Sequence, residues 1–110
     1  MKVNKAIGVG NLLVINQKTL AKVFVHQIIM LKGDVNYTTI CLEGGITKVI
    51  ARPLKFFEEY LKLHGFLRVH RSFLVNPHYV IERNIDSQFL LMKDGTIVTI
   101  ARRRKDVFTN

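Results

Sequence analysis

The sequence predicts a mainly β fold, namely a compact antiparallel β-sheet domain with one short helix. Three observations lead to this prediction. Short segments of alternating apolar and polar residues fill most of the chain, turn signals separate them, and a single segment has helical spacing. A length of 110 residues with 48% hydrophobic residues and only two prolines is typical of one folded domain. We therefore expect a single domain over residues 1–110.

The extended segments are expected in regular succession along the chain. Turn signals lie at residues 32–34, at 43–45, and at Asp94 and Gly95. Asp94 and Gly95 form a strong two-residue hairpin signal, because both residue types tolerate a positive φ. The last third is therefore predicted to be an antiparallel meander. The expected strands cover roughly residues 7–16, 21–25, 27–32, 37–42, 47–51, 67–70, 80–84, 88–92 and 97–101.

Residues 52–65 predict the one amphipathic helix. Pro53 suits a first helical position, and Gly65 is a natural C-terminal stop. The apolar residues of this segment form one broad stripe that would pack on the core. They are Leu54, Phe56, Phe57, Tyr60, Leu61 and Leu63.

The segment 66–76 is the most informative, because its alternation breaks. Residues 67–69 suit a half-buried strand, but the same period would place Arg71 on the apolar face. Either Arg71 is buried with a partner, or the strand ends near His70 and the chain turns. The second alternative, which we favour, presents Arg71 and Asn76 outward.

Ser72 supports that turn. Serine is a good cap for a single helical turn, which would carry residues 73–75. Asn76 would end this turn, since a residue that precedes proline avoids the helical region.

Charge indicates the class of partner. The chain has 17 Lys and Arg against 8 Asp and Glu, a formal net charge of +9 and a pI near 10.1. Four cations follow one another at residues 102–105. Nucleic acid is the commonest partner of such a pattern. An anionic membrane, an acidic protein and a merely solvated basic face are the alternatives.

Catalytic and metal-binding patterns are not found in the sequence. The four histidines are far apart, and the single cysteine, Cys41, can form neither a Cys-x-x-Cys pair nor an internal disulfide. We therefore expect no metal, no cofactor and no enzymatic activity. Apolar runs stay well below the roughly 20 residues of a membrane span, and a cytoplasmic location is expected.

Taken in order, the motifs resemble the LytTR DNA-binding domain, the output domain of LytR/AlgR-type bacterial response regulators. The resemblance covers about residues 12–108 and is most specific in Arg-Val-His-Arg-Ser-Phe-Leu-Val-Asn at 68–76. It also rests on residues 27–31, 34–37, 94–95 and 100–103. The resemblance implies a compact β fold that binds duplex DNA by inserting loops into successive major grooves.

The resemblance also implies where the DNA contacts fall. Arg71 would make a bidentate contact to guanine, and Arg103 a second base or phosphate contact. Asn36 and Tyr37 would contact bases or the DNA backbone, although Asn36 could instead cap a turn and Tyr37 could be half-buried core. His70 would only position the turn. The whole expected DNA-binding set is Asn36, Tyr37, Arg71, Arg102, Arg103 and Arg104, with Lys48 and Lys105 on phosphates.

Two departures from the family pattern affect what can be expected. Ala101 stands where the family usually has serine, so a hydroxyl group is missing, and the receiver domain of response regulators is not present in these 110 residues. The sequence therefore predicts a transcription regulator that binds promoter DNA as two copies on repeated half-sites. It is either a stand-alone regulator, controlled by partner binding or abundance, or a fragment whose sensor was removed. The alternative is a protein-interaction module of the same fold, held by an inhibitory partner through the apolar N-terminal strands. RNA binding is disfavoured by the sparse aromatic residues on strands.

Overall fold

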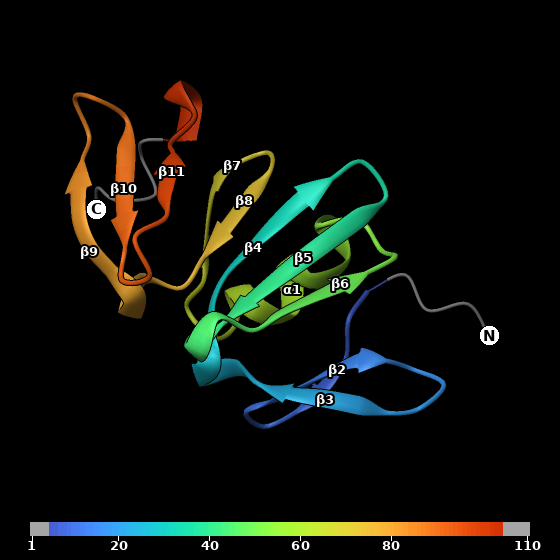
Figure 1. The fold of residues 1–110 in the computed structure, drawn as a ribbon. Coiled ribbons are helices and arrows are strands. Elements are labelled where there is room, and N and C mark those ends of the chain that lie inside the picture. Colours follow the sequence, from blue (N-terminus) through green and yellow to red (C-terminus); the bar gives the residue numbers. More distant parts are fainter. Residues whose placement is uncertain (1–4, 105–110) are drawn as a thin grey trace.

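The computed structural model describes residues 5–104, in which eleven strands form three antiparallel sheets beside one α-helix (Figure 1). The expected fold class is therefore confirmed. A five-stranded sheet lies between the other two, and short 3-10 turns connect the sheets.

The N-terminal sheet has three strands in the order β1-β2-β3. They are β1 (Gly8–Val9), β2 (Leu12–Asn16) and β3 (Ala21–Phe24). We expected one strand over residues 7–16, and this was wrong. Gly10 adopts a φ of +58°, which folds the segment into the β1–β2 hairpin.

The central sheet has five strands in the order β6-β5-β4-β8-β7. Residues 73–75 were expected as a helical turn, but they form β8, in which Val75 pairs with Met30 and Phe73 with Lys32. Pairing with β4 therefore overrides the capping tendency of Ser72. The strands are β4 (Ile28–Asp34), β5 (Tyr37–Leu42), β6 (Thr47–Ile50), β7 (Leu67–His70) and β8 (Phe73–Val75).

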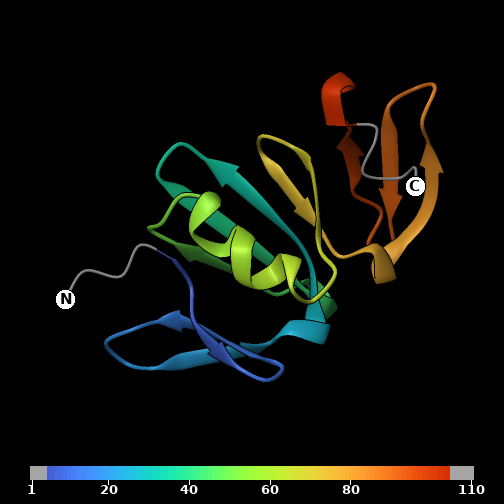
Figure 2. The ribbon, with the colours of Figure 1, turned by 180° about the vertical axis from the view of Figure 1, so that it is seen from behind.

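Helix α1 (Lys55–Lys62) covers one face of the central sheet, and the N-terminal sheet lies next to the helix (Figure 2). Gly65 follows the helix with a φ of +90°, as expected of a C-terminal stop. Leu63 was expected on the apolar stripe, but its side chain is 82% exposed. The helix buries Phe56, Phe57 and Leu61, which join the first core cluster with Leu13, Ile28, Leu31, Ile40 and Leu74.

The C-terminal sheet is the expected meander. Its strands β9 (Val80–Asn84), β10 (Phe89–Met92) and β11 (Ile97–Thr99) follow the order β11-β10-β9. A second core cluster joins this sheet to the opposite face of the central sheet. It contains Ile29, Met30, Val69, Val75, Leu90, Met92, Val98 and Ile100.

Tyr79 fixes the junction between these two sheets. Its hydroxyl group has two acceptors for its one proton, the carbonyl oxygen of His26 at 2.5 Å and a carboxylate oxygen of Glu43 at 2.7 Å. Burial, followed by the hydrogen bond to Glu43, raises the pKa of Tyr79 to about 12. The C-terminal sheet is thus held through the 3-10 turns η1 (Val25–Gln27), η2 (Glu43–Gly45) and η3 (Pro77–Tyr79).

Candidate nucleic-acid interface

Three segments that the sequence singled out lie on one side of the molecule, the upper side in Figure 1: the β4–β5 turn, the β7–β8 turn and residues 102–104. Two main-chain hydrogen bonds connect them. The nitrogen of Gly33 donates to the oxygen of Ser72 at 2.8 Å, and the nitrogen of Ala101 donates to the oxygen of Val69 at 2.8 Å. The fold therefore brings together segments that are far apart in the sequence.

The β4–β5 turn consists of two residues, Val35 and Asn36, between the paired Asp34 and Tyr37. Asn36 is exposed, and the side chain of Tyr37 is 55% exposed, so Tyr37 is not part of the core. We expected the turn at residues 32–34, and this was wrong, because β4 continues through Asp34.

Gly33 therefore lies within a strand, and the reason is steric. A Cβ atom on Gly33 would come within 2.8 Å of the Cβ atom of Leu54. The glycine allows the segment before α1 to approach β4 closely.

The β7–β8 turn presents Arg71 outward, as the favoured alternative predicted. Strand β7 ends at His70, and Arg71 is exposed. Among residues 5–104, the Arg71 guanidinium forms no ion pair with a carboxylate. The main-chain nitrogen of Ser72 donates to Nδ1 of His70 at 3.0 Å, which tightens the turn from its strand end.

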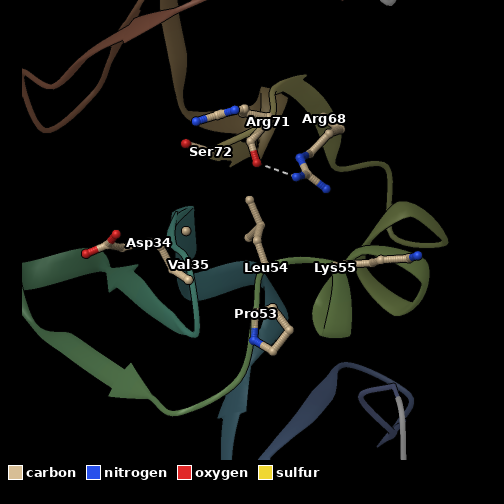
Figure 3. Close-up of a pocket in the computed structure, with 9 residues that line it drawn as sticks. Asp34, Val35, Pro53, Leu54, Lys55, Arg68, Arg71 and Ser72 are labelled. Carbon is tan, nitrogen blue, oxygen red and sulfur yellow. Dashed lines mark hydrogen bonds between the residues drawn. The ribbon is translucent and has the colours of Figure 1, made fainter.

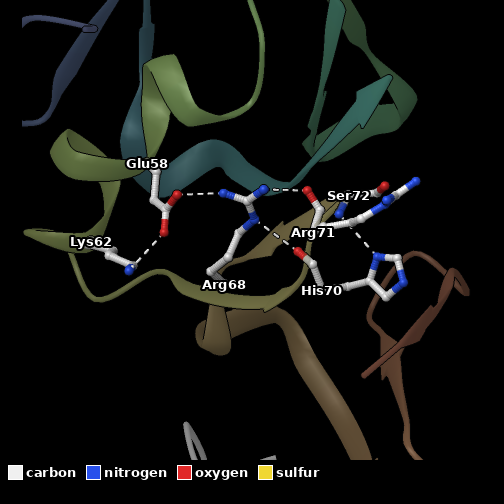
Figure 4. A network of polar contacts seen from close by, with 6 residues as sticks. All are labelled: Glu58, Lys62, Arg68, His70, Arg71 and Ser72. Carbon is white, nitrogen blue, oxygen red and sulfur yellow. Dashed lines mark hydrogen bonds and ion pairs between the residues drawn. The ribbon is translucent and has the colours of Figure 1, made fainter. Parts of the chain in front are cut away.

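Arg68 is the residue of this site that sequence reasoning missed (Figure 4). Its side chain is only 12% exposed, and its guanidinium donates to a carboxylate oxygen of Glu58 and to the carbonyl oxygens of His70 and Arg71. Glu58 also forms an ion pair with Lys62 at 2.8 Å. Arg68 therefore braces the backbone of the turn against α1. The arginine that is buried with a partner is Arg68, whereas Arg71 is exposed and has no carboxylate partner in the described part of the chain.

The Glu58 carboxylate remains charged in this network. Burial alone would raise its pKa, but the hydrogen bond from Lys62 and the charge of Arg68 outweigh burial and hold the pKa below its ordinary value of 4.5. Arg68 thus keeps its counter-ion well below neutral pH.

Asn76 was expected to point outward, and this was wrong. Only 8% of Asn76 is exposed. Its amide nitrogen donates to the oxygen of Ile28 at 3.0 Å, and its amide oxygen accepts from the nitrogen of His78 at 3.1 Å. Asn76 therefore caps η3 and ties it to β4.

Residues 102–104 form a 3-10 turn after β11. Arg102 and Arg103 are exposed, whereas Arg104 is partly buried and lines a cleft of about 290 Å³ with Lys62 and Arg68. The buried Nε of Arg104 has no hydrogen-bond partner within residues 5–104. The backbone therefore presents two adjacent arginines to the outside and turns the third toward the end of α1.

The two lysines assigned to phosphates lie elsewhere. Lys48 is exposed in the middle of β6, at the opposite edge of the central sheet from β7. Lys105 lies outside the residues that the structure describes.

The arginines impose a positive field on the β7–β8 turn. Burial lowers the pKa of His70 below its ordinary 6.5, and the nearby charges of Arg71, Arg104 and Arg68 lower it further. His70 is therefore neutral at pH 7, which its role as acceptor from Ser72 requires.

A cleft of about 320 Å³ separates the β4–β5 turn from the β7–β8 turn (Figure 3). Val35 lies on one wall and Arg71 on the other, and Leu54 lies between them near the start of α1. Two turns at this separation offer an apolar and a cationic group to the same ligand.

Other ligand classes find less support in the described part of the chain. Within residues 5–104, His, Cys, Asp and Glu side chains nowhere gather in threes to form a metal site. None of the helices in that range is long and apolar enough to cross a membrane.

An antiparallel β domain that carries exposed arginines on two of three adjoining turns, and exposed Asn36 and Tyr37 at the third, has the character of a nucleic-acid-binding module. The comparisons with known proteins agree with this class. The model of the LytTr DNA-binding domain matches residues 18–110, so the chain belongs to the LytTR family of DNA-binding transcription regulators, which is not an enzyme family.

A solved structure shows the same fold. It is the LytTr DNA-binding domain of a protein from Bacillus cereus described as a methyl-accepting/DNA response regulator. The two chains superpose with a TM-score of 0.74 at 22% identity, over 91% of this chain and 94% of the other. The comparison with curated protein sequences found no match.

Proposed function

We propose that this chain is a bacterial transcription regulator that binds specific promoter DNA by placing its turns in the major groove. One observation carries the proposal: a braced turn presents Arg71, whose guanidinium forms no ion pair within residues 5–104, beside two further turns of the same surface. An exposed guanidinium on a braced backbone, without an ion pair among residues 5–104, suits bidentate recognition of guanine O6 and N7.

We assign the other DNA contacts according to the exposure of each side chain. Asn36 and Tyr37, exposed on the β4–β5 turn, would contact base edges or the adjacent DNA backbone. Arg103 would make the second base contact, with Arg102 on phosphate. Arg104 would donate from its partly buried position to a phosphate that approaches the end of α1.

Long-range charge would supply the part of the affinity that does not depend on sequence. The net charge of +9 favours any duplex, and Lys48 and Lys105 would contact phosphates only. Replacing Lys105 should weaken binding to all sequences similarly and lower the salt slope by about one.

We further propose that two copies bind two half-sites about one helical turn apart, since proteins that read the major groove from one face of the duplex repeat at about 10 base pairs.

Selection from a random pool of duplex DNA, at about physiological salt, tests the proposal, because non-specific binding is weak there. Enrichment of two short motifs about one helical turn apart is the expected result. Binding without enrichment would overturn it.

Such an outcome would favour the alternative, a protein-interaction module held by an inhibitory partner. Ile7 and Val9 support that alternative, because they are 49% and 73% exposed at the β1 edge of the N-terminal sheet.

A further inference from the structure

Val35 has a backbone conformation that its own side chain disfavours. It is the first residue of the two-residue β4–β5 turn, and its φ is +40°. A β-branched residue rarely adopts this left-handed region, because its branched Cβ crowds the neighbouring backbone. Glycine and asparagine adopt it at less cost, and the next residue is in fact Asn36. The needs of the turn therefore do not explain a valine at position 35.

Packing does not explain it either. The side chain of Val35 is 85% exposed, more than any other large apolar side chain among residues 5–104. Burial within this chain therefore does not offset the strain. A strained residue that contributes nothing to the core is a candidate for function, because the fold holds it in place at a cost.

The position of Val35 indicates which function. It lies across the cleft from Arg71 (Figure 3), next to Asn36 and Tyr37, and the bond from Gly33 to Ser72 fixes the two turns relative to each other. On a surface that reads base edges, the apolar group available to an isopropyl side chain in the major groove is the 5-methyl group of thymine.

We propose that Val35 reads the 5-methyl group of one thymine in the preferred site. This inference rests on the proposed function, since it requires the β4–β5 turn to enter the major groove. It predicts that neighbouring bases of one half-site are recognised by different interactions. Arg71 would form hydrogen bonds with a guanine, and Val35 would make an apolar contact with a thymine.

Replacement of thymine by uracil tests the inference, because it removes the methyl group and leaves every hydrogen-bonding group in place. In the best duplex from the selection, each thymine is replaced in turn, and affinities are measured for the unmodified protein and for Val35→Gly. We expect one position at which uracil lowers the affinity of the unmodified protein about fourfold, the effect of one buried CH₂-sized group. The Val35→Gly variant should bind the duplexes with thymine and with uracil at that position with equal affinity.

A second variant separates recognition from folding. Asparagine tolerates a positive φ, so Val35→Asn should raise the melting temperature while it abolishes the methyl effect. Val49→Ala is the matched control, because Val49 is 64% exposed in the regular strand β6. It should leave both affinity and the methyl effect unchanged.

The possible failures are distinguishable. If a preferred site exists but no thymine shows the methyl effect, or the effect persists in Val35→Gly and Val35→Asn, Val35 does not read thymine and the proposed function stands. If no duplex is enriched at all, both are overturned.

Discussion

The main-chain nitrogen of Gly33 donates to the carbonyl oxygen of Ser72 at 2.8 Å, and this bond joins the two hairpins whose turns form the candidate interface. It continues the pairing of β4 with β8 beyond Lys32 and Phe73. The two turns are thereby held at a fixed separation before any ligand binds. Such preorganisation lowers the entropy cost of binding.

Substitution of Gly33 by alanine should therefore weaken both the fold and DNA binding. The added Cβ atom would lie 2.8 Å from the Cβ atom of Leu54, so the strand or the segment before α1 must shift. We expect a loss of about 1 to 3 kcal/mol in the free energy of unfolding, as for other overpacked sites. Urea denaturation measures it, and an unchanged midpoint would mean that the close approach to Leu54 is unimportant.

Substitution of Arg71 by alanine should cost about 1 to 3 kcal/mol of binding free energy on the preferred site and relax the preference at one base pair. Arg71→Lys should retain the salt-dependent part of the affinity but lose the base preference, because lysine lacks the planar fork. Fluorescence anisotropy with matched and mismatched duplexes measures both effects. Lys18→Ala, which removes an exposed charge on the N-terminal sheet side, is the control. A folded Arg71→Ala protein with full preference would contradict the assignment.

Much of the fold could be predicted because local patterns decide it. The bounds of β5, β7 and β9 agree with the expected segments 37–42, 67–70 and 80–84, where residues alternate between clear turns. The errors lie where distant pairing decides. Ser72 is a good cap by itself, but the ladder of β8 with β4, some forty residues away in sequence, makes residues 73–75 extended.

The candidate site likewise contains residues that a local pattern predicts and residues that only distant packing places. The break in alternation at Arg71 is a local signal, and it correctly predicted an exposed arginine. The brace from Arg68 was not predictable from the pattern, because its partner Glu58 lies on α1 and meets it only after the helix has packed. Asn76 was misplaced for a similar reason, since its amide group serves Ile28 on a strand 48 residues earlier.

Substitution of Glu58 by glutamine should destabilise the protein, because it leaves the mostly buried Arg68 without a counter-ion. Hydrogen bonds to charged groups contribute about 1.5 to 3 kcal/mol each, and we expect a loss of that order in the free energy of unfolding. Glu59→Gln is the matched control on the same helix. The pair of Glu59 with Lys5 spans 3.3 Å and is more than 60% exposed on both sides, so its loss should cost less than about 1 kcal/mol. Equal urea midpoints for the two variants would contradict this role of Glu58.

The ion pair of Glu58 with Arg68 also predicts that the stability of the protein depends on pH in the acid range. The pKa of Glu58 is lowered in the folded state, so its contribution is complete above the ordinary pKa of 4.5 and is lost as the pH falls through the lower folded value. Urea midpoints measured on the acid side should fall less steeply with pH in Glu58→Gln than in the unmodified protein. Parallel curves would mean that the carboxylate does not stabilise the fold through its charge.

His70 should act as a hydrogen-bond acceptor within the β7–β8 turn, and two isosteric variants distinguish its ring atoms. The amide oxygen of asparagine can replace Nδ1 as the acceptor from Ser72, whereas glutamine places its amide near Nε2. We expect His70→Asn to retain the stability of the protein and His70→Gln to lose about 0.5 to 1.5 kcal/mol, one ordinary hydrogen bond. Urea midpoints at neutral pH measure the difference, and a more stable His70→Gln protein would contradict the acceptor role.

The pH dependence of His70 follows from the direction of its pKa shift. The folded state holds the pKa below 6.5, so between the folded pKa and 6.5 the unfolded chain binds more protons than the folded one. The free energy of unfolding should therefore be highest above pH 6.5, fall as the pH drops through this window, and level off below the folded pKa. His70→Asn, which does not titrate, should show no decrease there beyond that of the other groups. An NMR titration of the imidazole that gave a pKa above 6.5 would contradict this account, because the surrounding arginines would then not govern the charge of His70.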